Sequence, residues 1–355
     1  MKNKLTVFCI MVLMGSVLMY STPIERQDLY IKAVSEKDLQ VKIQLLKEYQ
    51  QLYGQQQDNY LKFVYIQLAE SLFQVKNYTE TIVYGEKALE YTEIPATNKL
   101  TVLFALANSY YQTQKDLQKA FAYGTSMVEI AQWVMDKAKN SELEKDKLIQ
   151  FIDTYKNFYI APVYRLQAMI VYSKDKQNPE VIKEAAQKAI SAFLEDQSEN
   201  SAKLVFFFAG ELFKMNLTDD AIALSTQAFD ESNPNPRFAT FLATLYYKIN
   251  DKEKAIHYFE LAYKTDRDIK TAMKIGQLVY KKDIDKGIQY FADAYIMSSF
   301  DENSQAYKFL QQLYYHQKAK GLPAQEQDKG FNDIIQAAKA RVGVENTHQN
   351  GSTSN

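Results

Sequence analysis

The sequence predicts an all-α protein, a right-handed α-solenoid made of antiparallel helical hairpins. The chain of 355 residues contains only 7 prolines and 11 glycines, whereas sheet proteins need turn residues every few positions. Its composition, 46% hydrophobic and 24% charged, is that of a folded soluble protein. A pattern of small and large apolar residues also recurs at a fixed interval, which indicates a repeat architecture.

The N-terminal segment predicts export. Lys2 and Lys4 precede the uncharged run Leu5–Tyr20, which is shorter than the roughly 20 apolar residues that span a membrane. We therefore expect a signal peptide over residues 1–21 and a secreted, periplasmic or cell-envelope location. Cutting at the end of this segment puts Met19 where a small residue is usual, so an uncleaved anchor stays an alternative and is the one route to a membrane.

The next segment, residues 22–60, is interpreted as a degenerate N-terminal hairpin. Its two amphipathic helices are divided at Ser35, and Asp38 lies three positions further on, close to the spacing of a capping box. Such an atypical end unit is common in helical arrays, because the terminal hairpin has a neighbour on one side only.

The repeat is plainest within residues 201–342. Three alanines of one unit return in the next as Ala209/Ala243, Ala221/Ala255 and Ala228/Ala262, each pair 34 positions apart by subtraction. The same skeleton is recognisable over residues 61–139 and 273–295, and a stretched unit at 304–342 supplies C-terminal capping helices. Hairpin turns are expected at Lys76-Asn77-Tyr78, Asn216-Leu217-Thr218, Asn250-Asp251 and Lys282-Asp283.

This period, with small residues at fixed places, resembles the tetratricopeptide repeat. The resemblance implies a superhelix whose first helices line a concave face, and a non-catalytic scaffold that binds a peptide or protein partner there. It does not identify the partner. The alternative is a structural subunit of an envelope or secretion complex, with mainly lateral contacts to copies of itself or to other subunits.

The central segment, residues 140–200, departs from the repeat. Ser141 and Glu144 have the spacing of a capping box, which predicts a helix start, and Pro162 should kink or break that helix. An enzyme with a site between residues 132 and 196 is a third hypothesis, but this stretch contains no histidine or cysteine. The polar tail, residues 343–355, is expected to be disordered.

A ladder of aromatic and basic residues is the candidate partner-binding groove. An aromatic residue follows the Leu/Tyr position of each first helix, with lysines beside three of them and a column of cations nearer the helix starts. The ladder consists of Phe73, Tyr111, Phe213, Tyr247, Tyr280 and Tyr315, with Lys214, Lys248 and Lys281 beside them and Lys203, Arg237 and Lys270 in the column. Rings with flanking cations suit a peptide that bears carboxylates. Packing and solubility within the repeat consensus are the competing explanation.

Other chemistry finds little support in the sequence. Forty-two basic and 43 acidic residues leave no basic surplus for nucleic acid. His257, His316 and His348 have no histidine three or four positions away, so no helix presents a metal pair. The single cysteine, Cys9, allows no intrachain disulfide. We therefore predict no metal, no cofactor and no catalytic residue.

Overall fold

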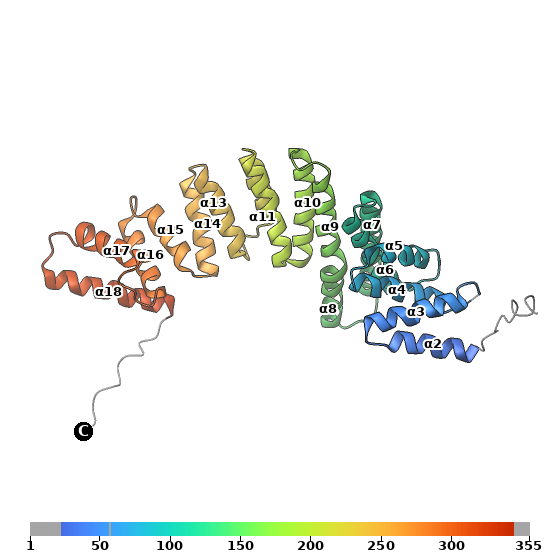
Figure 1. Cartoon of the computed structure of the whole chain (residues 1–355). Coiled ribbons are helices and arrows are strands. Elements are labelled where there is room, and N and C mark those ends of the chain that lie inside the picture. Colours follow the sequence, from blue (N-terminus) through green and yellow to red (C-terminus); the bar gives the residue numbers. More distant parts are fainter. Residues whose placement is uncertain (1–22, 57, 344–355) are drawn as a thin grey trace, which may run out of the picture. The chain divides into compact units, whose positions relative to one another are not determined.

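The computed structural model describes residues 23–56 and 58–343 (Figure 1). All regular structure in these ranges is helical, and successive helices pack as pairs, so the predicted all-α array of helical hairpins is confirmed. The predicted signal peptide and all but the first residue of the predicted tail lie outside the described residues. Within the described ranges, no helix combines the length and the apolar character that crossing a membrane requires.

The chain divides into two units between Ile170 and Val171. The first unit contains α2 (Pro23–Ser35), α3 (Leu39–Tyr53), α4 (Leu61–Gln74), α5 (Tyr78–Leu89), α6 (Ala96–Thr113), α7 (Leu117–Lys139), α8 (Lys145–Tyr155), a π-helical turn (Lys156–Ile160) and most of α9 (Ala161–Lys174). The first two helices separate after Ser35 as predicted, but Ser35 does not cap the second one. The Ser35 hydroxyl donates to the Lys32 carbonyl at the end of α2, and the Asp38 side chain caps α3 by accepting from the backbone N–H groups of Gln40 and Val41.

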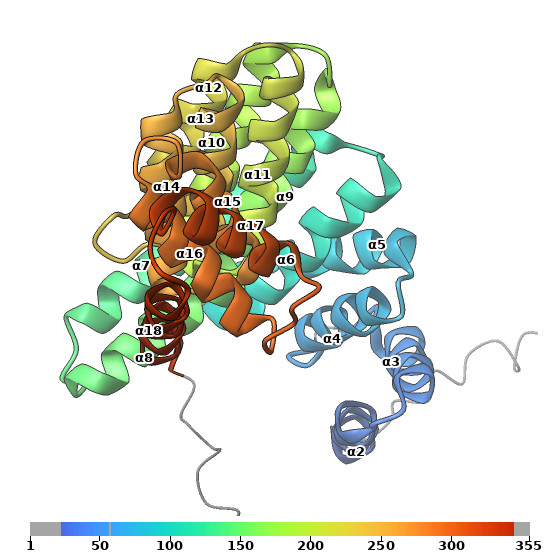
Figure 2. The same ribbon diagram turned by 90° about the vertical axis from the view of Figure 1, so that its left-hand side faces the viewer.

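The second unit continues the hairpins to the C-terminal end of the described chain. It contains α10 (Pro179–Asp196), α11 (Glu199–Lys214), α12 (Thr218–Gln227), α13 (Pro236–Lys248), α14 (Lys252–Thr265), α15 (Ile269–Val279), α16 (Ile284–Met297), α17 (Gln305–Leu313), a second π-helical turn (Tyr314–Lys318) and α18 (Ala324–Val342). In Figure 2, α18 is seen close to end-on.

Three hairpins turn with the same local geometry. Lys76, Asn216 and Asn250 each adopt a positive φ, of 61°, 63° and 64°, which ends the preceding helix. The backbone N–H of the following residue then donates to the carbonyl five positions back, at 2.8 Å from Asn77, 3.0 Å from Leu217 and 2.9 Å from Asp251. This is the Schellman pattern, which satisfies carbonyls that the helix end leaves free. Three of the four predicted turns therefore share one physical cause, whereas at Lys282-Asp283 the Asp283 N–H donates to the Val279 carbonyl, four positions back, without a positive φ.

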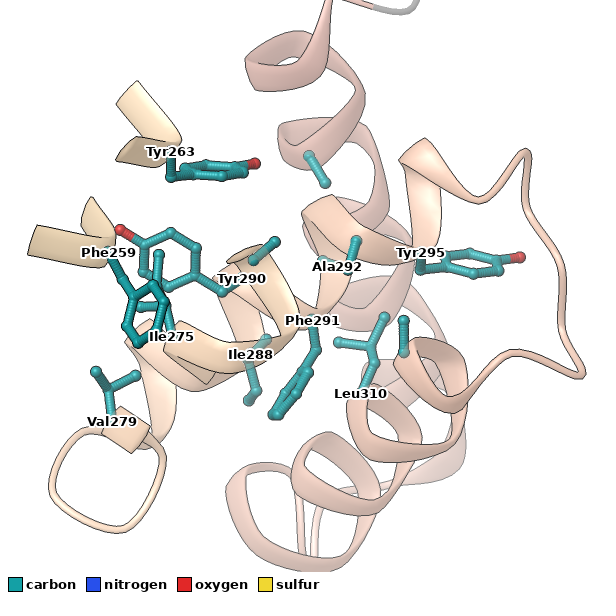
Figure 3. Packing of buried hydrophobic residues seen from close by; sticks show 14 of the residues in the cluster. Phe259, Tyr263, Ile275, Val279, Ile288, Tyr290, Phe291, Ala292, Tyr295 and Leu310 are labelled. Carbon is teal, nitrogen blue, oxygen red and sulfur yellow. The ribbon is translucent and has the colours of Figure 1, made fainter. Parts of the chain in front are cut away.

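Small residues let the paired helices approach. The alanines of the repeat are fully or almost fully buried, and Gly276 takes the same place on α15. A Cβ on Gly276 would lie 2.9 Å from the ring of Phe291, closer than real Cβ contacts come. That ring fills the space between α15 and α17 (Figure 3). The small residue at this position therefore makes room for an aromatic ring of the next helix.

The central helices differ from the prediction in one respect. Ser141 and Glu144 do not form a capping box: the Ser141 hydroxyl donates to the Ala138 carbonyl at the end of α7, and Glu144 precedes α8 without a side-chain cap. The loop between α7 and α8 places the serine at a helix end instead of a helix start. The expected irregularity near Pro162 takes the form of the π-helical turn Lys156–Ile160, directly before α9.

One carboxylate joins three helices of the first unit. Oε1 of Glu86, on α5, accepts hydrogen bonds from the Tyr110 hydroxyl at 2.6 Å, the Tyr123 hydroxyl at 2.8 Å and the Lys119 ammonium at 2.9 Å. Burial favours a raised pKa for this carboxyl group, but the hydrogen bonds from Tyr110, Lys119 and Tyr123 outweigh it, so the pKa of Glu86 is lowered.

We expect Glu86→Gln to lower the free energy of unfolding of the first unit by about 1 kcal/mol at pH 7, because charge-assisted hydrogen bonds become neutral ones. The wild-type advantage should be complete above the unfolded pKa of about 4.3. It should fade as the pH falls through the lowered folded pKa of Glu86. Urea unfolding followed by fluorescence of Trp133, the single tryptophan, measures the difference in free energy of unfolding between the two chains at each pH. Glu129→Gln, at an exposed position of α7, is the control. A loss of stability in Glu86→Gln that does not change with pH would contradict the stabilising role of the ionised Glu86 carboxylate.

Candidate functional site

The second unit brings its first helices α11, α13 and α15 together around two adjoining pockets. Phe206 of α11 packs on Phe238 and Phe241 of α13, with ring centroids 4.5 and 5.0 Å apart. The two pockets share lining residues on α13 and α15, namely Thr240, Thr244, Lys270 and Thr271. They therefore form one continuous groove along the first helices.

The first pocket, of about 590 Å³, contains the predicted column of cations: Lys203, Arg237 and Lys270 all line it. The first two do not stand alone. Oε1 of Glu199, in the first turn of α11, lies 2.7 Å from an Arg237 guanidinium nitrogen and 3.0 Å from the Lys203 ammonium. These cations hold the pKa of Glu199 below its usual range. Asp266 and Asp268 also line the pocket, so opposite charges are balanced here.

The second pocket, of about 420 Å³, has a different charge. Its lining consists of Tyr247, Lys248, Phe259, Lys270 and Lys274 with the three threonines Thr240, Thr244 and Thr271. We call it the lysine pocket, because lysines are its only charged residues. None of the three forms an ion pair within the described residues. The pocket therefore joins apolar surface to three lysines, of which Lys270 also lines the first pocket with Asp266 and Asp268.

Two of these lysines lie over aromatic rings. The Lys274 ammonium lies 3.7 Å from the centroid of the Tyr247 ring, and the Lys248 ammonium lies 4.6 Å from that of Phe213. Such contacts hold the side chains against the wall without neutralising them. Tyr247 and Lys248 are exposed, and Lys270 at the start of α15 is exposed as well. The ammonium groups are thus available to an anionic ligand.

The other ladder residues lie elsewhere. Lys214 pairs with Glu211 at 2.7 Å, and the Tyr315 ring stacks on Phe331 of α18, with centroids 5.2 Å apart. Tyr280 packs against α16 at Gly287, and Lys281 lies beside its ring. In the first unit, Phe73 meets Phe104 edge to face and Tyr111 is half-buried in the core. Of the residues predicted, Tyr247, Lys248 and Lys270 line the lysine pocket, while Lys203 and Arg237 line the first pocket with Lys270.

Sequence reasoning missed Lys274 and the three threonines. Lys274 follows Lys270 by four positions, so both lie on one face of α15. The same spacing relates Thr240 and Thr244 on α13. An i, i+4 scan of each first helix could have found Lys274, Thr240 and Thr244, but not Thr271, which has no such partner in the pocket. The ion pairs of Glu199 could not be found in this way, because they depend on how α11 and α13 pack.

His257 and His316 line neither of the two pockets. Among the described residues, no cluster of three or more histidine, cysteine, aspartate or glutamate side chains could hold a metal ion. His257 is exposed and lies 3.1 Å from Glu231, and His316 is exposed on the second π-helical turn. His348 lies outside the described residues.

No protein-family model and no curated protein matches the chain. Among solved structures, the apo form of RapI is 12% identical, with 90% of this chain and all of that chain covered and a TM-score of 0.39. PilF of Pseudomonas aeruginosa is 19% identical, with 70% and 96% covered and a TM-score of 0.29. The TPR2AB domain of yeast Sti1, in a complex with pHSP90, is 11% identical, with 89% and 97% covered and a TM-score of 0.30.

The class of protein follows from the chain's own features. The 34-residue period, the shared turn and the buried small positions occur together in consecutive antiparallel hairpins. Its fold is an all-α array of helical hairpins, similar in period and packing to the tetratricopeptide repeat.

Proposed function

We propose that the chain is a non-catalytic scaffold that holds an acidic segment of a partner protein in the lysine pocket. The observation that carries this proposal is the pocket's lining: three lysines without an acidic partner stand around apolar surface from Phe259 and Tyr247. Positive charges gathered at the wall of a pocket attract a ligand of opposite charge. A carboxylate-bearing peptide with an apolar side chain would complement both parts of the lining.

The proposal places the partner on the first helices, the face that the tetratricopeptide resemblance makes concave. It also places the protein outside the cytoplasm, on the strength of Lys2, Lys4 and the apolar run Leu5–Tyr20. N-terminal sequencing of the protein from a fractionated envelope would test the second point. A start near residue 22 supports a cleaved signal, an intact Met1 supports an anchor, and recovery in the cytosol contradicts export.

The binding experiment compares two labelled peptides that differ only in charge: one carries glutamates around leucine and phenylalanine, and the other carries lysines in place of the glutamates. We expect the wild-type chain to prefer the acidic peptide. Lys270→Glu/Lys274→Glu should weaken its binding by about tenfold or more, which corresponds to about 1.4 kcal/mol. Fluorescence anisotropy at fixed ionic strength gives both dissociation constants.

A matched control makes the same charge change outside the groove. Lys252→Glu/Lys264→Glu alters two exposed residues of α14 and should leave the affinity within about twofold of wild type. Equal affinity for the two peptides, or an unchanged affinity in the Lys270/Lys274 variant, would reject the lysine pocket as the binding site.

The structural-subunit alternative is favoured by a different observation. Trp133, on α7, and Phe158, on the π-helical turn after α8, are large apolar residues with 53% and 69% of their surface exposed. Exposed apolar residues gathered on one hairpin indicate a contact surface. Crosslinking in the native envelope, followed by identification of the attached proteins, separates a foreign partner from further copies of the chain.

A further inference from the structure

Helix α8 presents an apolar surface that no neighbouring helix of its unit covers. It pairs with α7 (Figure 2), yet Tyr155 is its only buried residue. Leu143, just before the helix, Ile149 within it and Phe158 just after it are 44%, 49% and 69% exposed. A helix of this amphipathic pattern ordinarily buries its apolar stripe. Here part of that stripe faces outward.

The π-helical turn explains the exposure of Phe158. In a regular α-helix, residues three positions apart share a face, so Phe158 would lie close to the buried Tyr155. The turn Lys156–Ile160 has wider hydrogen-bonded rings, closed by the Ala161 N–H donating to the Lys156 carbonyl. It therefore rotates Phe158 away from the core, while Ile160 stays buried. Turns of this kind recur at functional sites.

The charges of this surface are acidic. A shallow concavity of about 400 Å³ is lined by Asp146, Ile149, Gln150, Asp153, Thr154, Asn157 and Phe158. We call these residues the α8 face. Its only charged residues are Asp146 and Asp153, and neither forms an ion pair within the described part of the chain.

We propose that the α8 face of one copy of this chain occupies the lysine pocket of a second copy. The charged residues of the α8 face are all acidic and those of the lysine pocket are all basic. Each surface also offers apolar side chains, Ile149 and Phe158 on one and Tyr247 and Phe259 on the other. A helix laid in a groove between first helices is a recurring mode of recognition. The proposal rests on the proposed function, because it uses the same pocket.

The helix geometry suits this pairing. Asp146 and Asp153 are seven residues apart, two helical turns or about 10 Å along α8. Both carboxylates therefore lie on the side that carries Ile149, and they can reach lysines on different helices: Lys248 on α13 and Lys270 or Lys274 on α15. Because the contact joins two different surfaces, a pair of copies still has one free α8 face and one free lysine pocket. Such heterologous contacts extend into rings or chains.

Sedimentation velocity of the full chain between about 1 and 100 µM tests the proposal, in a range where a micromolar contact changes occupancy. We expect the weight-average mass of the wild-type chain to rise with concentration. Asp146→Lys/Asp153→Lys should weaken this association at least tenfold, and so should Lys270→Glu/Lys274→Glu. An equimolar mixture of the two variants should associate again, because each supplies the charge that the other has reversed.

Two further variants sharpen the result. Phe158→Ala should weaken association without changing any charge, whereas Glu93→Lys/Glu129→Lys, at exposed positions of the same unit, should leave it unchanged. A wild-type chain that stays monomeric at 100 µM overturns the proposal. So does a mixture that fails to associate.

The peptide-binding measurement keeps this proposal separate from the proposed function. Asp146→Lys/Asp153→Lys leaves the lysine pocket intact, so it should bind the acidic peptide at least as tightly as the wild-type chain does. A chain that binds this peptide but never self-associates overturns the further inference alone. A chain that self-associates through α8 with no effect of the Lys270/Lys274 change also overturns it, since the α8 face then has another receptor.

Discussion

Phe291→Ala is expected to lower the free energy of unfolding of the second unit by about 3–5 kcal/mol. The Phe291 ring is fully buried on α16, where it stacks on Phe309 of α17 with ring centroids 5.1 Å apart and an interplanar angle of 12°. It also occupies the space left by the missing side chain of Gly276. Truncation removes apolar contacts and leaves a cavity between three helices that the packed neighbours cannot close.

Urea unfolding followed by far-UV circular dichroism measures this loss. The fluorescence of Trp133 reports the first unit, and its transition should not move. Leu194→Ala, at a position of α10 that is 58% exposed, is the control and should cost less than about 1 kcal/mol. A Phe291→Ala variant as stable as that control would mean that this ring is not a central packing element of the unit.

The hairpin array could be predicted because its determinants are local. A turn residue that accepts positive φ, such as Asn216 or Asn250, and an alanine at each close approach recur every 34 positions. They leave a visible period in the sequence. The separation of the two N-terminal helices after Ser35 was also predicted, although Asp38 and not Ser35 caps the second helix. Patterns of this kind depend on residues that are close in the sequence. They can therefore be predicted before the fold is known.

The features that escaped prediction depend on packing between helices. The capping-box pattern at Ser141 did not start a helix because its serine caps the end of α7 instead. Arg237 was predicted as part of a column of cations, but Glu199, one hairpin earlier, pairs with it. The same holds for the lysine pocket: Lys248 and Lys270 were predicted as part of the ladder, while their grouping with Lys274 in one pocket emerges only from the arrangement of α13 and α15.

The second large effect is expected at a buried ion pair that holds α18 in place. Asp293, only 2% exposed on α16, accepts at Oδ1 from the Nε and Nη2 groups of Arg341 at 3.0 and 2.7 Å. The Tyr263 hydroxyl donates to its Oδ2 at 3.1 Å. Arg341→Met removes the cation and leaves a buried carboxylate, which should cost about 3 kcal/mol or more at neutral pH. Urea unfolding of the second unit measures this cost.

The cost should depend on pH in a defined direction. Burial raises the pKa of Asp293, and the hydrogen bonds and charge of Arg341 oppose that rise. Without Arg341 the folded pKa should rise further. The folded state then keeps a proton that the unfolded state, with a pKa of about 3.9, releases, so stability falls as pH increases between those two values. The deficit of Arg341→Met should therefore be largest at pH 7–8 and shrink as the pH is lowered through the raised pKa.

A double variant separates the buried charge from lost packing. Asp293→Leu/Arg341→Met replaces both partners by apolar side chains, and it should recover most of the stability because no charge stays buried. Its free energy of unfolding should no longer follow the pH dependence of Arg341→Met. If the single variant loses the same stability at pH 4 as at pH 8, the carboxylate is not the cause, and the contribution of Arg341 lies in the packing of its aliphatic stem.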